Sequence, residues 1–321
     1  MHPLCQKHMI IFLYIYLLLK FFMAYYNVFE NMFTITTDTS IDIFRGKILA
    51  DSCRYIPLTF RVKGKEYADE FNADKDYLDF YSAMRTSSEI PSTSQISPFD
   101  HEQFFEKIYL ELKTDILHLS LSSGLSETYE SACSGAAAFM QKYPQAKVHV
   151  IDTLGATTAS IPLYEKAVSL RDSGAEVSEA ADILREYAKT IRVYIVVDDL
   201  KCLMHGGRIS PAKARLAMAL NIKPIVVFDN AGKLDLHKKA LGMKKALKIV
   251  VHDIKNSVSK NATKILIAHA DALKTAEEAA EMLEKETGLK TEIHWIGPVI
   301  GSHTGPGTVG FVFESDIGRT F

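Results

Sequence analysis

Hydroxyl side chains gather in two stretches in the first half of the sequence. Residues 92–95 read Ser-Thr-Ser-Gln just before an expected helix start, and residues 121–129 read Leu-Ser-Ser-Gly-Leu-Ser-Glu-Thr-Tyr. In the second stretch a buried strand is expected to end and a helix to begin, which is where parallel α/β sheets place ligands. Backbone N–H groups and the helix dipole favour an anion there, and the hydroxyls of Thr93 and Ser126 could donate to it. Alternatively, Ser126 caps its helix and Thr93 belongs to a turn.

Two stretches in the second half carry a cation and an imidazole. Residues 205–211, His-Gly-Gly-Arg-Ile-Ser-Pro, place Arg208 on a tight turn, where it could clamp a carboxylate or phosphate or meet an acidic partner. Residues 296–307 surround the pair His303–Thr304 with four glycines and two prolines, which specify the backbone tightly and are expected to present the imidazole from a loop. His303 would then be an anion ligand or an acid/base. The alternatives are a surface arginine after a helix end and a hydrogen-bonded structural histidine.

Several familiar catalytic motifs are missing. The sequence has no GxSxG nucleophile elbow, no Walker A sequence, no GxGxxG after a strand and no HExxH helix. The four cysteines lie far apart without a CxxC pair, so we expect neither a zinc site nor a disulfide framework, and a reducing cytoplasm fits best. Cys133 lies within a helical run and is expected to be a small core residue.

The elements that must position these residues alternate between short β-branched runs and longer helical stretches. This pattern is typical of βα units and a parallel sheet. Ser97–Pro98 forms an N-cap followed by proline at the first helical position. The expected strands are 33–37, 55–62, 116–121 and 147–152, and the expected helices are 75–85, 98–112, 126–143 and 157–172.

A second set of elements begins near residue 190, after a connecting helix at 178–190. Residues 222–229 and 234–237 are expected to form a hairpin around an Asn-Ala-Gly-Lys turn, so this half contains antiparallel pairing. The other expected elements are strands 193–197, 265–268, 292–296 and 309–313 and helices 244–254 and 273–286. We therefore predict an α/β protein with a parallel-sheet domain at 33–190 and a mixed-sheet domain at 191–321.

Composition fits a globular protein of about two domains. Of 321 residues, 47% are hydrophobic and 24% charged, and 37 basic against 39 acidic side chains give a net charge of −2. Such a balance offers no general attraction for nucleic acid or anionic lipid. Residues 1–32 form a hydrophobic extension with three readings: translation that naturally starts at Met32, a membrane anchor, or a signal sequence.

Taken together and in order, the polar stretches resemble the DegV family of fatty-acid-binding proteins, which in bacteria serve as the lipid-carrying subunit of a fatty acid kinase. The resemblance runs from Phe33 to about Phe313. It rests on Thr-Thr-Asp-Thr-Ser at 36–40, Thr-Ser-Gln at 93–95, Ser-Ser-Gly-Leu-Ser at 122–126 with Thr-Tyr at 128–129, Gly-Gly-Arg-Ile-Ser at 206–210, Ile-Lys-Pro at 222–224 and Ser-His-Thr-Gly-Pro-Gly at 302–307.

The resemblance implies a two-domain DegV-type fold that holds a long-chain fatty acid between its halves, without another cofactor or a metal. Its carboxylate would be bound by residues at the polar loops, with Arg208 linked to the kinase or the head group. The implied ligand-binding residues are Thr93, Ser94, Ser123, Ser126, His303 and Thr304. The chain would then be a binding protein that presents the carboxylate to a separate kinase, with at most transient membrane contact unless residues 1–32 are an anchor.

Three positions depart from the family pattern. Glu127 places a carboxylate beside the expected anion where glycine is usual, Leu241 stands where an arginine is usual, and Ile96 replaces a proline. The first departure would interfere with head-group binding unless Glu127 points outward. The second would alter the kinase contact unless nearby lysines supply it.

An alternative function is an acyl-ester hydrolase or acyltransferase. In that reading Ser126 or Ser123 is the nucleophile and His303 the base, although a strained nucleophile elbow is missing. A scaffold module with an empty cleft is a third possibility.

Overall fold

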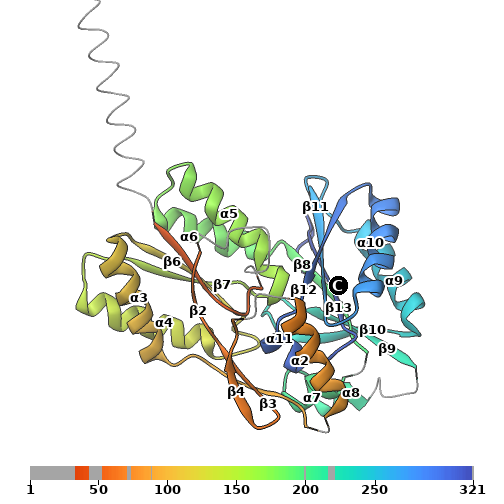
Figure 1. Ribbon diagram of the computed structural model, residues 1–321. Coiled ribbons are helices and arrows are strands. Elements are labelled where there is room, and N and C mark those ends of the chain that lie inside the picture. Colours follow the sequence, from red (N-terminus) through yellow and green to blue (C-terminus); the bar gives the residue numbers. More distant parts are fainter. Residues whose placement is uncertain are drawn as a thin grey trace, which may run out of the picture.

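The computed structural model describes residues 33–42, 53–70, 74–87, 89–198, 200–215 and 221–319. The predicted extension 1–32, with its three readings, lies outside these residues. Two large sheets lie roughly side by side, with helices between them and on their outer faces (Figure 1). Within the described part of the chain, none of the helices combines the length and apolar character needed to cross a membrane.

The first sheet is parallel throughout, as the alternation of strands and helices predicts. Its strand order is β2-β1-β6-β7. The strands are β1 (Thr34–Asp38), β2 (Arg54–Ile56), β6 (Ile116–Ser120) and β7 (Val148–Asp152). Helices α3 (Pro98–Leu112) and α4 (Thr128–Lys142) lie on its outer side, and α5 (Ile161–Asp172) and α6 (Val177–Ala188) lie toward the second sheet (Figure 1).

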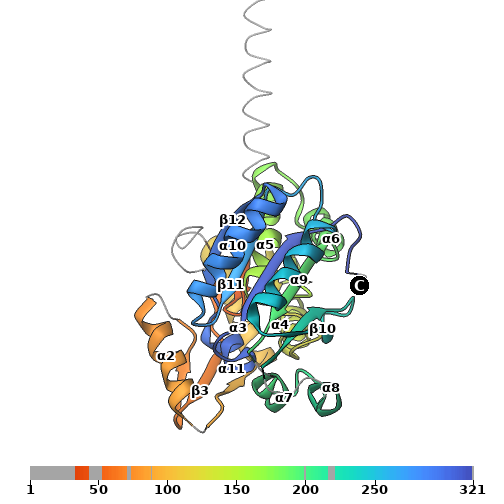
Figure 2. The same cartoon turned by 90° about the vertical axis from the view of Figure 1, so that its right-hand side faces the viewer.

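The second sheet is mixed, which confirms the predicted antiparallel pairing. Its order is β10-β9-β8-β13-β11-β12, and only β11 and β12 pair in parallel among these strands. The strands are β8 (Ile191–Val196), β9 (Ile222–Phe228), β10 (Leu234–Leu241), β11 (Lys264–His269), β12 (Lys290–Trp295) and β13 (Val309–Glu314). Figure 2 shows α9 (Met243–Lys255) and α10 (Leu273–Thr287) in front of this sheet, on its outer face.

A small antiparallel sheet, not predicted from the sequence, joins the two halves. It has the order β4-β3-β5, made of β3 (Thr59–Val62), β4 (Lys65–Ala68) and β5 (Ser92–Ser94), and it is accompanied by α2 (Asp74–Thr86). The single strand expected at 55–62 is therefore wrong. Pro57 cannot donate to a strand ladder, and here the chain leaves the first sheet and enters the small one.

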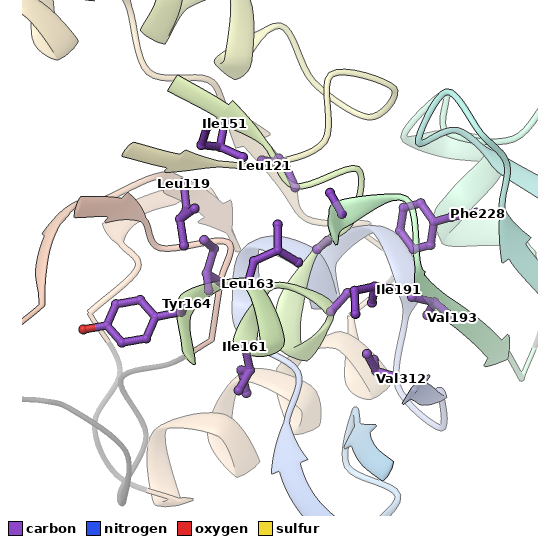
Figure 3. Packing of buried hydrophobic residues seen from close by; sticks show 14 of the residues in the cluster. Leu119, Leu121, Ile151, Ile161, Leu163, Tyr164, Ile191, Val193, Phe228 and Val312 are labelled. Carbon is purple, nitrogen blue, oxygen red and sulfur yellow. The ribbon is translucent and has the colours of Figure 1, made fainter. Parts of the chain in front are cut away.

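One hydrophobic core spans the space between the two large sheets. Figure 3 shows Leu163 of α5 between Leu119 of the first sheet and Val193 and Val312 of the second. All strands of the first sheet precede residue 190 and all strands of the second follow it. The division into domains 33–190 and 191–321 stays a prediction, because this core draws residues from both sides of the boundary.

Candidate functional site

A cavity of about 260 Å³ lies between the two sheets. Its wall is mostly apolar and takes residues from both halves of the chain, including Leu58, Leu121, Val193, Ile195, Phe228, Leu234, Ile296 and Val312. The polar lining residues are Thr93, Ser94, Gln95, Ser126, Thr157, Thr158, Arg208, His303 and Thr304. A mostly apolar cavity with a few polar groups is the usual form of a small-molecule site.

The first polar contact of the cavity joins the two halves. Thr93 lies on β5, which pairs with β3, and its Oγ1 lies 2.9 Å from Nε2 of His303, 210 positions along the chain. Two stretches singled out in the sequence therefore meet in one place.

A helix, and not a loop, presents His303. The short helix α11 (Pro298–Thr304) begins with proline in its first turn and is followed by Gly305 at φ 78°. Proline favours a helix start and a glycine with positive φ favours a helix end, so residues expected to hold a loop act as start and stop signals. The expected loop is thus wrong, although the imidazole does reach the cavity.

Burial keeps His303 neutral. The pKa of its imidazole is lowered to about 4, mainly by loss of water, and the nearby Arg208 and His205 act in the same direction. The helix α7 (Lys201–His205) ends against this ring: a Cβ on Gly206 would lie 2.2 Å from its Nδ1, so only glycine fits there. At neutral pH the ring can offer one N–H donor, and it carries no charge.

Thr304 brings a hydroxyl that lacks a partner. Its Oγ1 is buried and finds no hydrogen-bond partner among the described residues, although the side chain lines the cavity. A buried hydroxyl left unpaired costs roughly 1–3 kcal/mol. A polar group of a ligand that reached this hydroxyl would remove that cost.

Arg208 lines the same cavity without a protein counter-ion. Its Nε donates to the carbonyl oxygen of Leu125 at 3.0 Å, and Nη1 donates to the carbonyl oxygen of Gly206. Burial lowers the pKa of the guanidinium, and no ion pair joins it to a carboxylate of the described residues. A partly buried cation without a counter-ion favours an anionic ligand.

Ser126 lines the cavity and also supports the start of α4. Its Oγ accepts a hydrogen bond from the backbone N–H of Thr128 at 3.2 Å and lies 2.9 Å from Thr128 Oγ1. This local bond is not a helix cap, because the N-cap residue of α4 is Glu127 and no side chain caps it, so the expectation that Ser126 caps its helix is wrong. Glu127, which raised doubt about anion binding, is exposed and does not line the cavity.

Buried Asp38 positions the loop that carries Ser126 through a hydrogen bond to the backbone at the start of that loop. One oxygen of this carboxylate accepts from the backbone N–H of Leu121 at 2.8 Å. Burial raises the pKa of Asp38, while hydrogen bonds from Ser40, Leu121 and Ser120 oppose that rise. The Thr-Thr-Asp-Thr-Ser stretch therefore positions the loop without lining the cavity.

The two remaining predicted serines are placed differently. Ser94 lines the cavity and is exposed, which puts it at the open end. Ser123 does not line the cavity, and its backbone N–H donates to Asp152 Oδ1 at 3.2 Å. The structure thus does not bring Ser123 to the other candidate residues.

The arrangement does not assemble a serine nucleophile with its base. The hydroxyl of Ser126 bonds to Thr128, and the nitrogen Nε2 of His303 bonds to Thr93. An imidazole with a pKa of about 4 is also a weak base at neutral pH. Among the described residues, no group of three His, Cys, Asp or Glu side chains could hold a metal ion.

Sequence reasoning missed the cavity residues Thr157, Thr158, Ala268 and Gly310. The two threonines follow the carboxyl end of β7, so the general rule for parallel sheets could have found them. Ala268 and Gly310 are small residues within strands, and nothing in their local sequence distinguishes them from residues that pack a core.

Comparisons with known proteins show which family the chain resembles. The model of the DegV family, described as uncharacterised proteins, matches residues 32–316. The DegV domain-containing protein CPE0026 of Clostridium perfringens is 34% identical over 286 residues, which cover 88% of this chain and 98% of that protein.

Solved structures share this fold. The Thermotoga maritima protein TM841, whose structure is described as revealing a fatty acid binding function, has a TM-score of 0.75 at 28% identity and covers 88% of this chain and 99% of its own. The Streptococcus pneumoniae Fatty Acid Kinase B3 protein, loaded with linoleic acid, shares the fold with a TM-score of 0.78 at 21% identity, covering 89% and 100%. On the family match and the Clostridium relative, this chain belongs to the DegV family.

Proposed function

We propose that this protein binds a long-chain fatty acid in the cavity and presents its carboxylate to a separate fatty acid kinase, which forms the acyl phosphate. The observation that carries the proposal is the contrast within one cavity. Its wall is apolar over most of its extent, while Thr93, His303, Thr304 and Arg208 gather at one polar end. The names of the Thermotoga and Streptococcus proteins support a fatty acid as the ligand.

The apolar wall would supply most of the affinity. Burying about 14 methylenes at ~0.8 kcal/mol each is worth on the order of 11 kcal/mol before the costs of ordering the chain. Each hydrogen bond to a carboxylate adds about 1.5–3 kcal/mol. The tail therefore holds the ligand, and the polar end sets which atoms reach the opening.

The polar end has the groups that an ionised carboxylate needs. Thr304 and Ser126 would each donate a hydroxyl hydrogen bond, and the pair Thr93–His303, which already shares one hydrogen bond, would supply one more donor. Ser94, at the open end, would assist. The charge of Arg208 balances the carboxylate, which makes burial of the tail compatible with an ionised head group. Because Ser123 lies off the cavity, we leave it out of this set.

Phosphoryl transfer would be the work of the partner. Nucleotide-binding loops are missing from the sequence, and the site holds no nucleophile–base pair, so the chain would act as a carrier and not as an enzyme. Ser94, which is exposed at the open end of the cavity, and Arg208 would contact the kinase. Such a carrier would work in the cytoplasm and touch membranes transiently.

Solvent extraction of the purified full chain, followed by mass spectrometry, tests the first half of the proposal. We expect a bound fatty acid at close to one per chain. The stripped protein is then reloaded and incubated with a fatty acid kinase catalytic subunit and ATP, where acyl phosphate should form only when the loaded protein is present. Chains that carry no lipid and take none up would overturn the proposal, and covalent labelling of Ser126 by a fluorophosphonate probe would favour the hydrolase.

A further inference from the structure

The second sheet forms a floor of the cavity, and that floor has a step. In the register of strands β8, β13 and β11, Ile195 pairs with Gly310 and Gly310 pairs with Ala268. All three residues line the cavity. One row of side chains on this sheet therefore runs from the large Ile195 to Gly310, which has no side chain beyond hydrogen, and to Ala268, which has only a methyl group. We call this change in size the step.

The next row on the same face is filled. Side chains two residues apart on a strand point to the same side, so Val312 follows Gly310, Leu266 follows Ala268 and Val193 precedes Ile195. Val312 pairs with Val193 on one side and with Leu266 on the other. The small side chains of Gly310 and Ala268 therefore lie next to a filled row, and the space that they leave lies on the side of this sheet.

Backbone conformation does not require the glycine at this step. Gly310 lies outside the left-handed region, and a Cβ built on it would meet the Cβ of Ala268 at 3.9 Å and the carbonyl oxygen of Tyr194 at 4.0 Å, which are ordinary contacts. An alanine would fit without strain. What the glycine provides is space in the cavity.

The opposite wall at this level is fixed. It comes from the short helix η1 (Thr157–Ser160), which packs against β8 and β11 and contributes Thr157 and Thr158 to the lining. Thr157 has φ 54°, and its backbone N–H donates to the carbonyl oxygen of Ser40 at 2.7 Å. Because η1 is held by this hydrogen bond, it does not move in to fill the space left by Gly310 and Ala268.

We propose that Gly310 and Ala268 are the pair that sets how wide a tail the cavity accepts, and that their step admits a bent, cis-unsaturated acyl chain. The inference rests on the proposed fatty acid function. A straight saturated chain needs a channel of even width, whereas a cis double bond displaces carbon atoms to one side of the chain axis. Extra space on one side of the channel, next to a filled row, suits the second shape.

The test compares Gly310→Val with wild type. Stripped full-length protein is incubated with equal amounts of cis-9-octadecenoic and octadecanoic acid, and the bound acids are quantified by mass spectrometry. Since one misplaced methyl or methylene group in an apolar pocket shifts discrimination about 10- to 200-fold, the ratio of bent to straight acid should fall at least about tenfold in the variant. Gly310→Ala should shift the ratio in the same direction by less, and it serves if the valine variant does not fold.

Two further variants make the outcome specific. Val312→Ala enlarges the adjacent filled row and should raise the ratio of bent to straight acid, while Ala137→Val, on the exposed face of α4, should leave it unchanged. A ratio that does not move in Gly310→Val or Gly310→Ala, with wild type still loading both acids, overturns the inference and leaves the proposed function intact. A wild type that loads neither acid overturns both.

Discussion

Thr93 and His303 meet across 210 positions of sequence, and their hydrogen bond sets the state of both groups. The neutral imidazole and the hydroxyl share one hydrogen bond, so the pair keeps one proton that it can donate to a ligand. A charged imidazole would instead form an ion pair with the bound carboxylate. Because burial lowers the pKa of His303 to about 4, the fixed charge of the site comes from Arg208.

Removing the hydroxyls of Thr93 and Thr304 should weaken fatty acid binding more than it weakens the fold. We expect Thr93→Val and Thr304→Val each to lower affinity about 13- to 160-fold, because each loses a hydrogen bond to a carboxylate worth roughly 1.5–3 kcal/mol. Titration of the stripped variants with a fluorescent fatty acid measures this. Thr304→Val should also leave the melting temperature of the stripped protein equal or higher, because it removes an unpaired hydroxyl. A marked fall there would mean that Thr304 supports the fold.

Ser126→Ala should behave differently from the threonine variants. Ser126 lines the cavity, and its hydroxyl also accepts from the first amide of α4; loss of such a hydrogen bond costs about 0.5–1.5 kcal/mol of stability. We expect weaker binding together with a lower free energy of unfolding, measured by urea denaturation of the stripped protein. Unchanged stability would show that the bond to Thr128 contributes little.

Acid should destabilise the stripped protein through His303. Its folded pKa of about 4 lies below the ordinary 6.5, so the unfolded chain binds more protons between these values, and stability is lost as the pH falls from 6.5 toward 4. At ~1.4 kcal/mol for each tenfold change in proton affinity, the loss is roughly 3 kcal/mol. Urea titrations across this range should show a flatter pH dependence in His303→Gln. The exposed His252→Gln should match wild type.

At the scale of elements, a glycine fixes the distance between α3 and α4. A Cβ on Gly135 would lie 2.6 Å from the carbonyl oxygen of Pro98 and 2.7 Å from the Cβ of His101. The small residues near 135–138 therefore allow close helix packing on the outer side of the first sheet, and they do not line the cavity.

Gly135→Ala should consequently lower stability without changing ligand binding. Overpacking at such a contact typically costs about 1–3 kcal/mol. Urea denaturation should show this loss, while fatty acid uptake stays within error of wild type. Ser134→Ala, on the exposed side of the same helix, should leave both unchanged.

Much of this element layout can be predicted from the sequence, for identifiable reasons. Strands β1, β6 and β7 are short runs of β-branched or apolar residues near turn signals, and the Ser97–Pro98 start of α3 is confirmed by a hydrogen bond from the N–H of Asp100 to Ser97 Oγ. The strands of the small sheet could not be found in this way. Lys65–Ala68 is exposed throughout and Ser92–Ser94 has no apolar alternation, so only their pairing with β3 makes them strands.

Some residues of the candidate site could likewise be predicted from the sequence, and others could not. Residue type and loop position identified Thr93, Ser126, Arg208 and His303, because polar groups at element ends stand out against apolar runs. The step at Gly310 and Ala268 depends on which strands become neighbours, and that is a property of the assembled sheet. For the same reason the outward position of Glu127 could not be decided from its place in the motif.

At the scale of the whole molecule, contacts between distant segments hold the two sheets together. Ser122 Oγ donates to the carbonyl oxygen of Gly232 in the β9–β10 turn at 2.8 Å. Near the other end of the chain, buried Arg319 donates to the carbonyl oxygens of Leu154 and Ala188. The last described residues are thus fastened to the first half.

Arg319→Met should test this fastening. The variant leaves two carbonyl oxygens with fewer donors but keeps much of the apolar stem, so we expect a loss of about 1–3 kcal/mol in the free energy of unfolding. Urea denaturation measures it. Arg61→Met, an exposed residue of the small sheet, is the matched control and should cost under about 0.5 kcal/mol. Equal losses in both variants would argue against a special role for Arg319.

The bond between Thr93 and His303 also bears on how cargo leaves. Thr93 comes from the first half of the chain and His303 from the second, so neither half alone has the full set of groups that would bind the carboxylate. Loading would then reinforce the docking of the halves, and unloading would begin with their loosening. A partner protein that separated Thr93 from His303 would release the carboxylate before the acyl tail.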